Sequence, residues 1–415
     1  MTVNRADTAV PQHAPMDQFP IVDNCLQIGG EPVTDIAARA GTPFYAYDKA
    51  VISKTVHDLR AILPEHVNLH YAIKANPMPA VVEHTAGLVD GLDVASAGEL
   101  ALALSSGTDP ACISFAGPGK SDDDLLAAVT ANVIICMESA SEMARISALA
   151  TATGRRPRVA VRVNPEFELK LSGMRMGGSP KPFGIDAECV PDLLAQLGEL
   201  PLEFMGFHIF SGSQNLRADA IIEAQTRTVE LALQLAEAAP GPVRWLNIGG
   251  GLGVPYFPGE ERLDLAPIAS NLQSLLTKLR ARMPGVEVVM ELGRYLVAEA
   301  GIYVCQILDR KVSRGETFLI ANGGLHHHLA LSGNFGQVIR KNYPVCIGNR
   351  VQAVESEAVN VAGPLCTPLD VLATNMVLPK ASPGDLLVVF QSGAYGYSAS
   401  PRDFLGHPQP AQILL

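Results

Sequence analysis

The chain has 415 residues, of which 48% are hydrophobic and 18% are charged, and its formal net charge is −11. This composition is typical of a folded enzyme of about two domains, and it excludes a disordered or fibrous chain. The negative charge argues against nucleic acid or an anionic membrane as a binding partner.

The cysteines and the N-terminal residues predict a cytoplasmic protein. The seven cysteines are scattered and form no CxxC pair, which argues against structural disulfides and a zinc site. Residues 1–20 are polar and lack the apolar stretch of a signal peptide. No apolar run approaches the roughly 18–20 residues that span a bilayer, so we expect no membrane partner.

Short apolar segments rich in β-formers alternate with helical patterns through most of the chain. The predicted strands are Leu69–Lys74, Gly91–Ser96, Ile113–Gly117, Val133–Met137, Val159–Asn164, Met205–Phe210, Trp245–Gly249 and Val286–Glu291. The predicted helices include Ala97–Ser106, Asp122–Ala131, Ser141–Ala152, Ala218–Ala239 and Leu265–Met283. Alternating strands and helices indicate an α/β fold with a parallel sheet, and this number of units favours a (β/α)8 barrel over an open sheet.

After Gly301 the pattern changes to short strands separated by Gly- and Pro-rich turns. These predicted strands are Ile302–Leu308, Thr317–Ala321, Ala358–Ala362, Leu386–Phe390 and Ala411–Leu414. We therefore expect a barrel over residues 41–300 and a C-terminal β-rich domain over residues 301–415. We expect residues 1–40 to be an N-terminal segment that partly joins the β-rich domain.

Chemically reactive residue types follow the predicted barrel strands, at the end where barrel enzymes carry their active sites. In chain order they are Lys74, Asp93, Ser211–Gln214, Gly249–Gly251 and Glu291–Arg294. Taken singly, each has an ordinary explanation, such as a solvated charge or a tight turn. Together they indicate a phosphate site beside an amine nucleophile, because the N–H groups of a Gly-rich turn and an arginine both bind phosphate. An enclosed lysine has a lowered pKa, which suits Schiff-base chemistry.

Seven motifs in combination carry a family resemblance. They are YAIKAN at 71–76, DVASAGE at 93–99, SGSQ at 211–214, NIGGGLG at 247–253, ELGRY at 291–295, GPLCTPLD at 363–370 and GAY at 393–395. The chain resembles the fold-type III decarboxylases that use pyridoxal 5′-phosphate (PLP), a family that includes diaminopimelate, ornithine and biosynthetic arginine decarboxylases. The resemblance implies an alanine-racemase-like barrel, a homodimer with shared active sites and PLP as cofactor.

The resemblance also implies a role for each motif residue. Lys74 would form the internal aldimine with PLP, with Asp93 and Glu99 on the lysine side of the ring. Cys366 would reach the partner subunit's active site and protonate the quinonoid left after CO2 departs. The remaining implied cofactor contacts are Phe210, which stacks on the ring, Gly293, and the phosphate ligands Ser213, Gly249, Gly250, Gly251, Arg294 and Tyr395.

Glu291 distinguishes the reactions that this fold supports. A carboxylate at the pyridine nitrogen keeps the nitrogen protonated, so that the ring accepts the electrons released with CO2. Alanine racemases place an arginine there, and therefore Glu291 favours a decarboxylase over an amino-acid racemase. A non-catalytic PLP-binding protein is the third alternative, but the small proteins of that kind lack a second domain.

Three positions depart from the family pattern, and one of them, Leu292 in place of the usual proline, is expected to have no effect. Phe210 stands where the family usually has a ring-stacking histidine. Thr367 stands where ornithine and diaminopimelate decarboxylases have an acid that grips the distal amine, and a neutral side chain pairs poorly with a buried ammonium. The departure at Thr367 argues against a free diamino acid, although a diaminopimelate-, lysine- or ornithine-type activity stays the alternative.

The segments KANPMPAVV at 74–82, SGNFGQVIRKNYPV at 332–345 and SGAYGYSASP at 392–401 resemble a bacterial branch of the family that is associated with exosortase and exopolysaccharide systems. The chain is also similar to a decarboxylase of butirosin biosynthesis, which acts on glutamate held by an acyl-carrier protein. We therefore expect a small amino-acid substrate that is tethered through its side chain, with an acyl-carrier protein as a candidate partner. Further candidate substrate contacts are Asp370, Arg340 and His327.

The triplet His326–His328 suggests a metal site at first sight. Consecutive residues on a strand face alternate sides, so three adjacent histidines cannot all bind one ion. We expect no metal, and we assign the triplet to the lining of the substrate pocket or of an interface.

Overall fold

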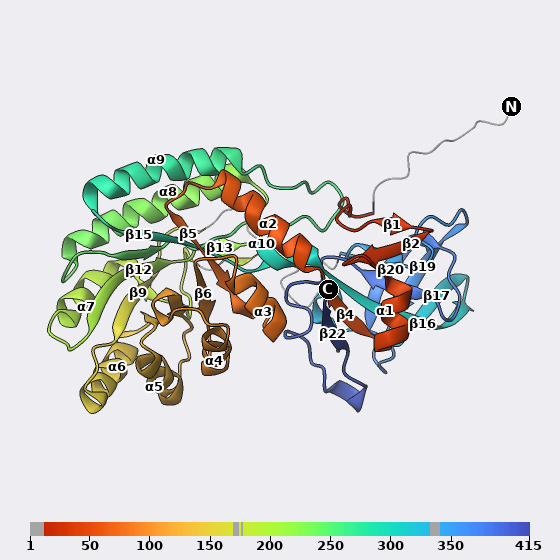
Figure 1. Ribbon diagram of the computed structural model, residues 1–415, viewed down its shortest axis with the longest axis horizontal. Helices are drawn as coiled ribbons and strands as arrows, with labels where there is room; N and C mark the ends of the chain where they lie inside the picture. The colour runs from red at the N-terminus through yellow and green to blue at the C-terminus, as the bar shows by residue number, and fades with distance from the viewer. Residues whose placement is uncertain (1–11, 169–173, 176, 333–340) are drawn as a thin grey trace.

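Eight parallel strands close into a barrel in the first part of the chain (Figure 1). The computed structural model describes residues 12–168, 174–175, 177–332 and 341–415. The barrel strands are β5 (Val67–Ala72), β6 (Gly91–Val94), β7 (Ile113–Phe115), β8 (Ile134–Met137), β9 (Arg158–Asn164), β12 (Glu203–Ile209), β14 (Trp245–Asn247) and β15 (Glu287–Leu292). Each pairs with the next, and β15 pairs back onto β5. The predicted (β/α)8 barrel is confirmed.

Helices cover the outside of the barrel (Figure 1). They are α2 (Lys49–Ile62), which precedes β5, and α3 (Pro79–Ala86), α4 (Ala97–Ser105), α5 (Asp122–Ala131), α6 (Ala140–Thr153), α7 (Val190–Leu197), α8 (Ala218–Leu235), α9 (Ala266–Arg282) and α10 (Arg294–Val297). Ser96, Ser121 and Ser139 each cap the helix that follows by accepting a backbone N–H from its first turn, which satisfies a donor that the helix leaves free. In the described part of the chain, no helix is long and apolar enough to cross a membrane.

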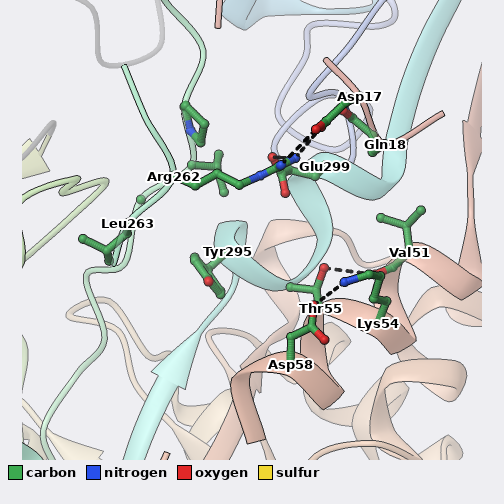
Figure 2. A pocket seen from close by; sticks show the side chains of 13 residues that line it. Asp17, Gln18, Val51, Lys54, Thr55, Asp58, Arg262, Leu263, Tyr295 and Glu299 are labelled. Carbon is green, nitrogen blue, oxygen red and sulfur yellow. Dashed lines mark hydrogen bonds and ion pairs between the residues drawn. The ribbon is translucent and has the colours of Figure 1, made fainter. Parts of the chain in front are cut away.

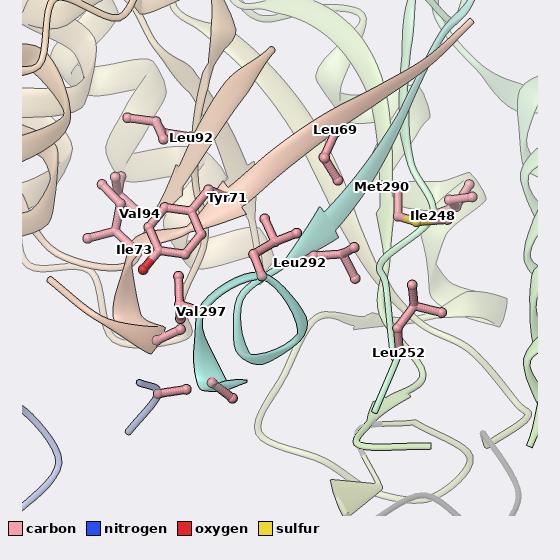
Figure 3. Close-up of a cluster of buried hydrophobic side chains, with 14 of the residues drawn as sticks. Leu69, Tyr71, Ile73, Leu92, Val94, Ile248, Leu252, Met290, Leu292 and Val297 are labelled. Carbon is pink, nitrogen blue, oxygen red and sulfur yellow. The ribbon is translucent and has the colours of Figure 1, made fainter. Parts of the chain in front are cut away.

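The barrel strands separate an apolar outer face from a more polar interior. Leu69 and Tyr71 of β5 lie with Met290 and Leu292 of β15 in the buried apolar cluster between barrel and helices (Figure 3). Side chains alternate along a strand, and so His70 and Glu291, which are register partners, face the interior. The strand pattern thus places titratable groups inside the barrel.

The C-terminal part forms a second sheet beside the barrel (Figure 1). Its strands are β16 (Gly301–Ser313), β17 (Glu316–Ala321), β18 (Val345–Ile347), β19 (Ser356–Ala362), β20 (Val371–Pro379) and β21 (Leu386–Val389), joined by β4 (Phe44–Tyr47) and β22 (Ala411–Leu414). The predicted β-rich domain is confirmed, and it contains two strands, β18 and β20, that the sequence patterns did not predict.

The N-terminal strand of this sheet is β4, which pairs with β16 and β22 and begins a few residues after the segment expected to join it. The preceding residues form a small sheet of their own, followed by a helix. Its elements are β1 (Ile21–Val22), β2 (Cys25–Ile28), β3 (Glu31–Pro32) and α1 (Val33–Ala40). Three short strands complete the fold: β10 (Met174–Arg175), which pairs with β13 (Gly212–Ser213), and β11 (Ile185–Asp186), which pairs with β9.

Two glycines allow the barrel and the second sheet to join closely. A Cβ on Gly393 would lie 1.7 Å from the carbonyl oxygen of Val297, and a Cβ on Gly301 would lie 2.3 Å from the Cα of Gly393. Backbone hydrogen bonds cross the same junction, from Gly393 to Ala298 and from Ser392 to Gly301. Side chains larger than hydrogen are therefore excluded here.

We expect Gly393→Ala to destabilise the fold by about 1–3 kcal/mol, because the added methyl group forces the backbone of α10 away from the second sheet. Urea denaturation of both proteins measures the loss. Gly241→Ala is the matched control, since a Cβ at Gly241 meets nothing within 4 Å and should change stability by less than about 0.5 kcal/mol. Equal unfolding midpoints for Gly393→Ala and the wild type would contradict the tight junction.

Candidate active site

Lys74 lies in a short 3-10 turn, Ile73–Ala75, directly after β5. Its Nζ is 3.9 Å from Oε1 of Glu291 at the end of β15. The second sheet holds this turn in place: the N–H of Tyr395 donates to the carbonyl of Ala75 (2.8 Å), and Nδ2 of Asn76 donates to the carbonyl of Gly393 (3.0 Å). Both parts of the fold therefore position the lysine.

The pKa of Lys74 is shifted in the opposite direction to the prediction. Desolvation by the surrounding barrel lowers the pKa of Lys74, but the carboxylate of Glu291, helped by Tyr395 and Asp93, outweighs it, so the pKa is raised above its ordinary value. The expected lowering is therefore wrong for the protein alone. The error arose because enclosure was considered without the acid that faces the amine.

Glu291 is buried and surrounded by polar groups. Its Oε2 accepts a hydrogen bond from Nδ2 of Asn247 (3.1 Å) and lies 3.0 Å from Nε2 of His208. Burial raises the pKa of Glu291, but His208 first, and then Lys74 and Arg162, lower it well below its usual range. Glu291 is therefore a carboxylate that remains charged and can face a protonated ring nitrogen.

His208, Asn247 and Arg162 were not among the predicted site residues. Arg162 of β9 donates to Oε1 of Glu138 (2.7 Å), and Glu138 also accepts the N–H groups of Gly117 and Gly184. This network ties two loops to the barrel mouth. The signal for His208 and Asn247 was their spacing, since each lies two positions before a predicted contact and so faces the same side of its strand.

Asp93 is buried beside the lysine-bearing strand. Its Oδ1 accepts hydrogen bonds from Oγ of Ser114 (2.5 Å) and contacts Nδ1 of His70 (3.1 Å). Its Oδ2 is buried and has no hydrogen-bond partner among the described residues. Glu99, predicted to act with Asp93, accepts the N–H of Ala95 (2.7 Å) at the start of α4, and burial raises its pKa.

The glycine turn follows β14 and has no room for side chains. A Cβ on Gly250 would lie 2.0 Å from the carbonyl oxygen of Glu291, and a Cβ on Gly249 would lie 2.8 Å from the ring of Phe210. Gly249 and Gly251 also have positive φ angles of 69° and 91°. The N–H groups of Gly250 and Gly251 have no acceptor in the described part of the protein, so they are available to a ligand.

Arg294 begins α10 close to the lysine turn. Its Nη1 donates to the hydroxyl of Tyr256 (2.8 Å), and its guanidinium lies 4.8 Å from the ring centre of Tyr395. A Cβ on Gly293 would lie 2.9 Å from that of Ala75, so Gly293 allows the two turns to approach. Ser213 lies in β13, which follows β12 closely.

A separate cavity of about 430 Å³ lies between α2, α10 and the N-terminal segment (Figure 2). Its charged lining side chains are already paired: Arg262 contacts Asp17 (2.9 Å) and Glu299 (3.3 Å), and Lys54 pairs with Asp58. Because no charge in this lining lacks a partner, the strand ends remain the better candidate site.

Cys366 and Thr367 lie in the loop between β19 and β20, and the thiol-bearing residue is exposed. Asp370, a predicted substrate contact, uses its two oxygens to accept the N–H groups of Leu325 (2.7 Å) and Leu365 (2.8 Å). It joins two loops of the second sheet. Arg340 lies outside the described residues.

The histidine triplet forms a turn after β17, not a strand as the alternation argument assumed. His327, a predicted substrate contact, has its ring nitrogens against the hydroxyl of Tyr303 (3.2 Å) and the carbonyl of Pro408 (3.0 Å). Burial lowers the pKa of His326 to about 3 and that of His327 to about 4. Within the described ranges, no group of His, Cys, Asp and Glu side chains could hold a metal ion.

We expect Glu291→Gln to lower the pKa of Lys74, because it removes the charge that faces the amine. Competitive acetylation of the protein over a range of pH, followed by peptide mass spectrometry, measures this pKa, since the Lys74 side chain is 52% exposed. Glu287→Gln, an acid-to-amide change on the same strand, is the control and should leave Lys74 unchanged. An unaltered Lys74 titration in Glu291→Gln would refute the assigned cause.

Comparisons with known proteins agree with this geometry. The family described as "Pyridoxal-dependent decarboxylase, pyridoxal binding domain" matches residues 49–298. The L-glutamyl-[BtrI acyl-carrier protein] decarboxylase of Niallia circulans is 38% identical over 92% of this chain and 90% of that protein. The 2-[(L-alanin-3-ylcarbamoyl)methyl]-2-hydroxybutanedioate decarboxylase of Staphylococcus aureus is 31% identical over 89% of this chain and 93% of that protein.

The fold agrees as well. The crystal structure of diaminopimelate decarboxylase from Helicobacter pylori, in complex with L-lysine, has a TM-score of 0.83 and 27% identity, and the match covers 92% of this chain and 94% of that one. The chain therefore belongs to the pyridoxal-dependent decarboxylases, and it is a PLP-dependent enzyme that removes CO2 from an amino acid.

Proposed function

We propose that Lys74 carries PLP at the barrel mouth and that the enzyme decarboxylates an amino acid linked through its side chain to a larger group. The observation that carries the first part is the pairing of Lys74 with Glu291, 3.9 Å apart at the ends of the first and last barrel strands. The second part rests on Thr367 and on the named substrates of two relatives.

The groups at the barrel mouth fit this cofactor. The N–H groups of Gly250 and Gly251 and the guanidinium of Arg294 suit a phosphate, with Ser213 and Tyr395 beside them. The atoms of Phe210 and Glu291 leave no room for a Cβ at Gly249 and Gly250, so the turn keeps its bare backbone. The unpartnered Oδ2 of Asp93 supplies a further acceptor on the lysine side.

When bound, PLP supplies the electron sink that makes loss of CO2 feasible. Glu291 would hold a proton on the ring nitrogen, and Asn247 and His208 would keep its carboxylate in place. Phe210, which lies against Gly249, would offer an apolar ring face in place of the usual histidine. Lys74 would provide the amine that binds the cofactor and releases it to the substrate.

Glu291 also supports decarboxylation over the alternatives. A racemase of this architecture needs a cofactor that is a weaker electron sink. The ionised carboxylate of Glu291 would instead strengthen the electron sink by keeping the ring nitrogen protonated. A non-catalytic PLP carrier would have no use for a cysteine in an exposed loop of a complete second domain. Decarboxylation of a free diamino acid is the main alternative to the proposed substrate.

The substrate proposal rests on the lack of an available acidic side chain beside Cys366. Thr367 is neutral, and Asp370, the nearby acid, is occupied by two backbone N–H groups. A free distal ammonium would therefore have no partner among these residues. The Niallia relative is named for glutamate on a carrier protein, and the Staphylococcus relative for an alanine joined through its side chain to an acid. Both names describe amino acids without a free distal amine.

We further propose that the active protein is a homodimer in which Cys366 enters the partner subunit's site and delivers a proton after CO2 departs. The Cys366 loop is linked by Asp370 to Leu325, beside His326, whose ring lies 5.0 Å from that of His407. Apolar side chains near this loop and His407 are exposed: Leu369 (63%), Phe404 (48%) and Leu405 (55%). An apolar exposed group of this kind suits a subunit contact. We also propose a cytoplasmic location, since all seven cysteines are free.

For the substrate, we expect the protein to release CO2 from a γ-glutamyl thioester or amide at least about tenfold faster than from lysine or diaminopimelate, a difference of about 1.4 kcal/mol. Measurement of CO2 with each compound tests this directly. Lys74→Ala should abolish release and also prevent covalent retention of PLP, whereas the control Lys54→Ala, at an exposed lysine, should retain both. Faster release from the free diamino acids would overturn the tethered-substrate proposal and leave the decarboxylase intact.

For the dimer, we expect Lys74→Ala and Cys366→Ala to be nearly inactive alone and to recover activity after mixing. Random exchange of subunits would restore about a quarter of wild-type activity, because half of the dimers are mixed and each mixed dimer has one intact site. Steady-state CO2 release before and after mild dissociation measures the recovery. No recovery, in a sample shown by mass spectrometry to contain mixed dimers, would place both residues in one subunit's site.

A further inference from the structure

A group of polar side chains lies inside the barrel below the lysine turn. His70 of β5 is 3% exposed, Asp93 of β6 is 7% exposed and Ser114 of β7 is 1% exposed, and the three strands are neighbours. A Cβ on Gly91, the register partner of His70, would lie 2.2 Å from the carbonyl oxygen of Cys112 and 2.4 Å from Nε2 of His70, so the imidazole and the neighbouring strand both require a glycine here. A buried histidine that requires a glycine opposite it has a defined position.

The two neighbours of Asp93 engage the same oxygen. Oγ of Ser114 (2.5 Å) and Nδ1 of His70 (3.1 Å) both contact Oδ1, and two contacts on one oxygen fix the rotation of the carboxylate. The other oxygen, Oδ2, is buried without a hydrogen bond from any described residue. A buried carboxylate oxygen without a donor is costly and requires an explanation.

The explanation lies on the next strand. Asp93 is the register partner of Ala72, two residues before Lys74, and its charge acts to raise the pKa of Lys74. We propose that His70 is a positioning residue, which together with Ser114 directs the free oxygen of Asp93 toward the amine of Lys74 and the cofactor bound there. His70 acts only through Asp93.

The electrostatics of His70 agree with this arrangement. Burial lowers the pKa of His70, whereas the negative charge of Asp93 raises it. Glu287 of β15 and Asp90 before β6 raise it further, so the pKa lies above its ordinary value. A histidine in its charged form donates from both ring nitrogens. The donor at Nδ1 is therefore retained at pH values where an isolated histidine would lose its charge.

The test measures Lys74 in protein freed of PLP, by competitive acetylation across pH. This inference rests on the proposed role of Lys74, but the measurement does not depend on PLP binding or on substrate, so it can fail independently. We expect His70→Leu to let the Asp93 carboxylate rotate away, which lowers the pKa of Lys74 and increases its acetylation about twofold or more at a fixed pH below that pKa. His70→Asn, whose amide can replace Nδ1, should restore part of the wild-type value.

A double-mutant cycle separates positioning from general damage. Asp93→Asn should lower the pKa of Lys74 as well, and His70→Leu should add nothing in the Asp93→Asn background. If His70→Leu does not fold, Ser114→Ala, which removes the second donor, and His70→Asn carry the test and should shift Lys74 in the same direction by less. An equal effect of the His70 change with and without Asp93, or no effect in folded variants, would overturn the proposal.

Discussion

The approach of Lys74 to Glu291 depends on closure of the barrel. The two residues are more than two hundred positions apart, and they meet because β15 pairs with β5 in a register that places Glu291 opposite His70. Glu291 is buried, and an opposite charge at this distance stabilises its carboxylate, which would be costly to bury alone. The last strand of the barrel therefore brings the acid to the first strand's lysine, and neither residue has the same chemistry without the other.

The second sheet is part of this arrangement, not an attachment to it. Its residues Tyr395 and Gly393 accept or donate hydrogen bonds at Ala75 and Asn76, and so they hold the turn that carries Lys74. The contact of Gly393 with the backbone of α10 ties the same sheet to the helix that begins with Arg294. The amine and the proposed phosphate ligand thus share one support, and a small shift of the second sheet relative to the barrel would move both.

The sequence predicted the barrel, the β-rich domain and the strand ends that carry the polar residues, because alternation of strands and helices and a lysine or glycine triplet at a strand end are local patterns. The spacing of His208 and Asn247 could indicate which side of a strand they face, but not which residues they contact. His208 and Asn247 act on Glu291 across strands, and His70 and Ser114 act on Asp93 in the same manner. Such pairings depend on register, which a strand pattern alone does not define.

The same reasoning applies to two of the predicted substrate contacts. Asp370 and His327 stand in motifs with reactive side chains, but in the fold their polar atoms are occupied by Leu325, Leu365, Tyr303 and Pro408. Whether a polar side chain serves a ligand or the framework depends on which partners the fold supplies. Asp370 and His327 have such partners, whereas Oδ2 of Asp93 and the N–H groups of Gly250 and Gly251 have none among the described residues. A fold retains such groups only at a cost, and these three belong to the strand ends that also carry Lys74 and Glu291.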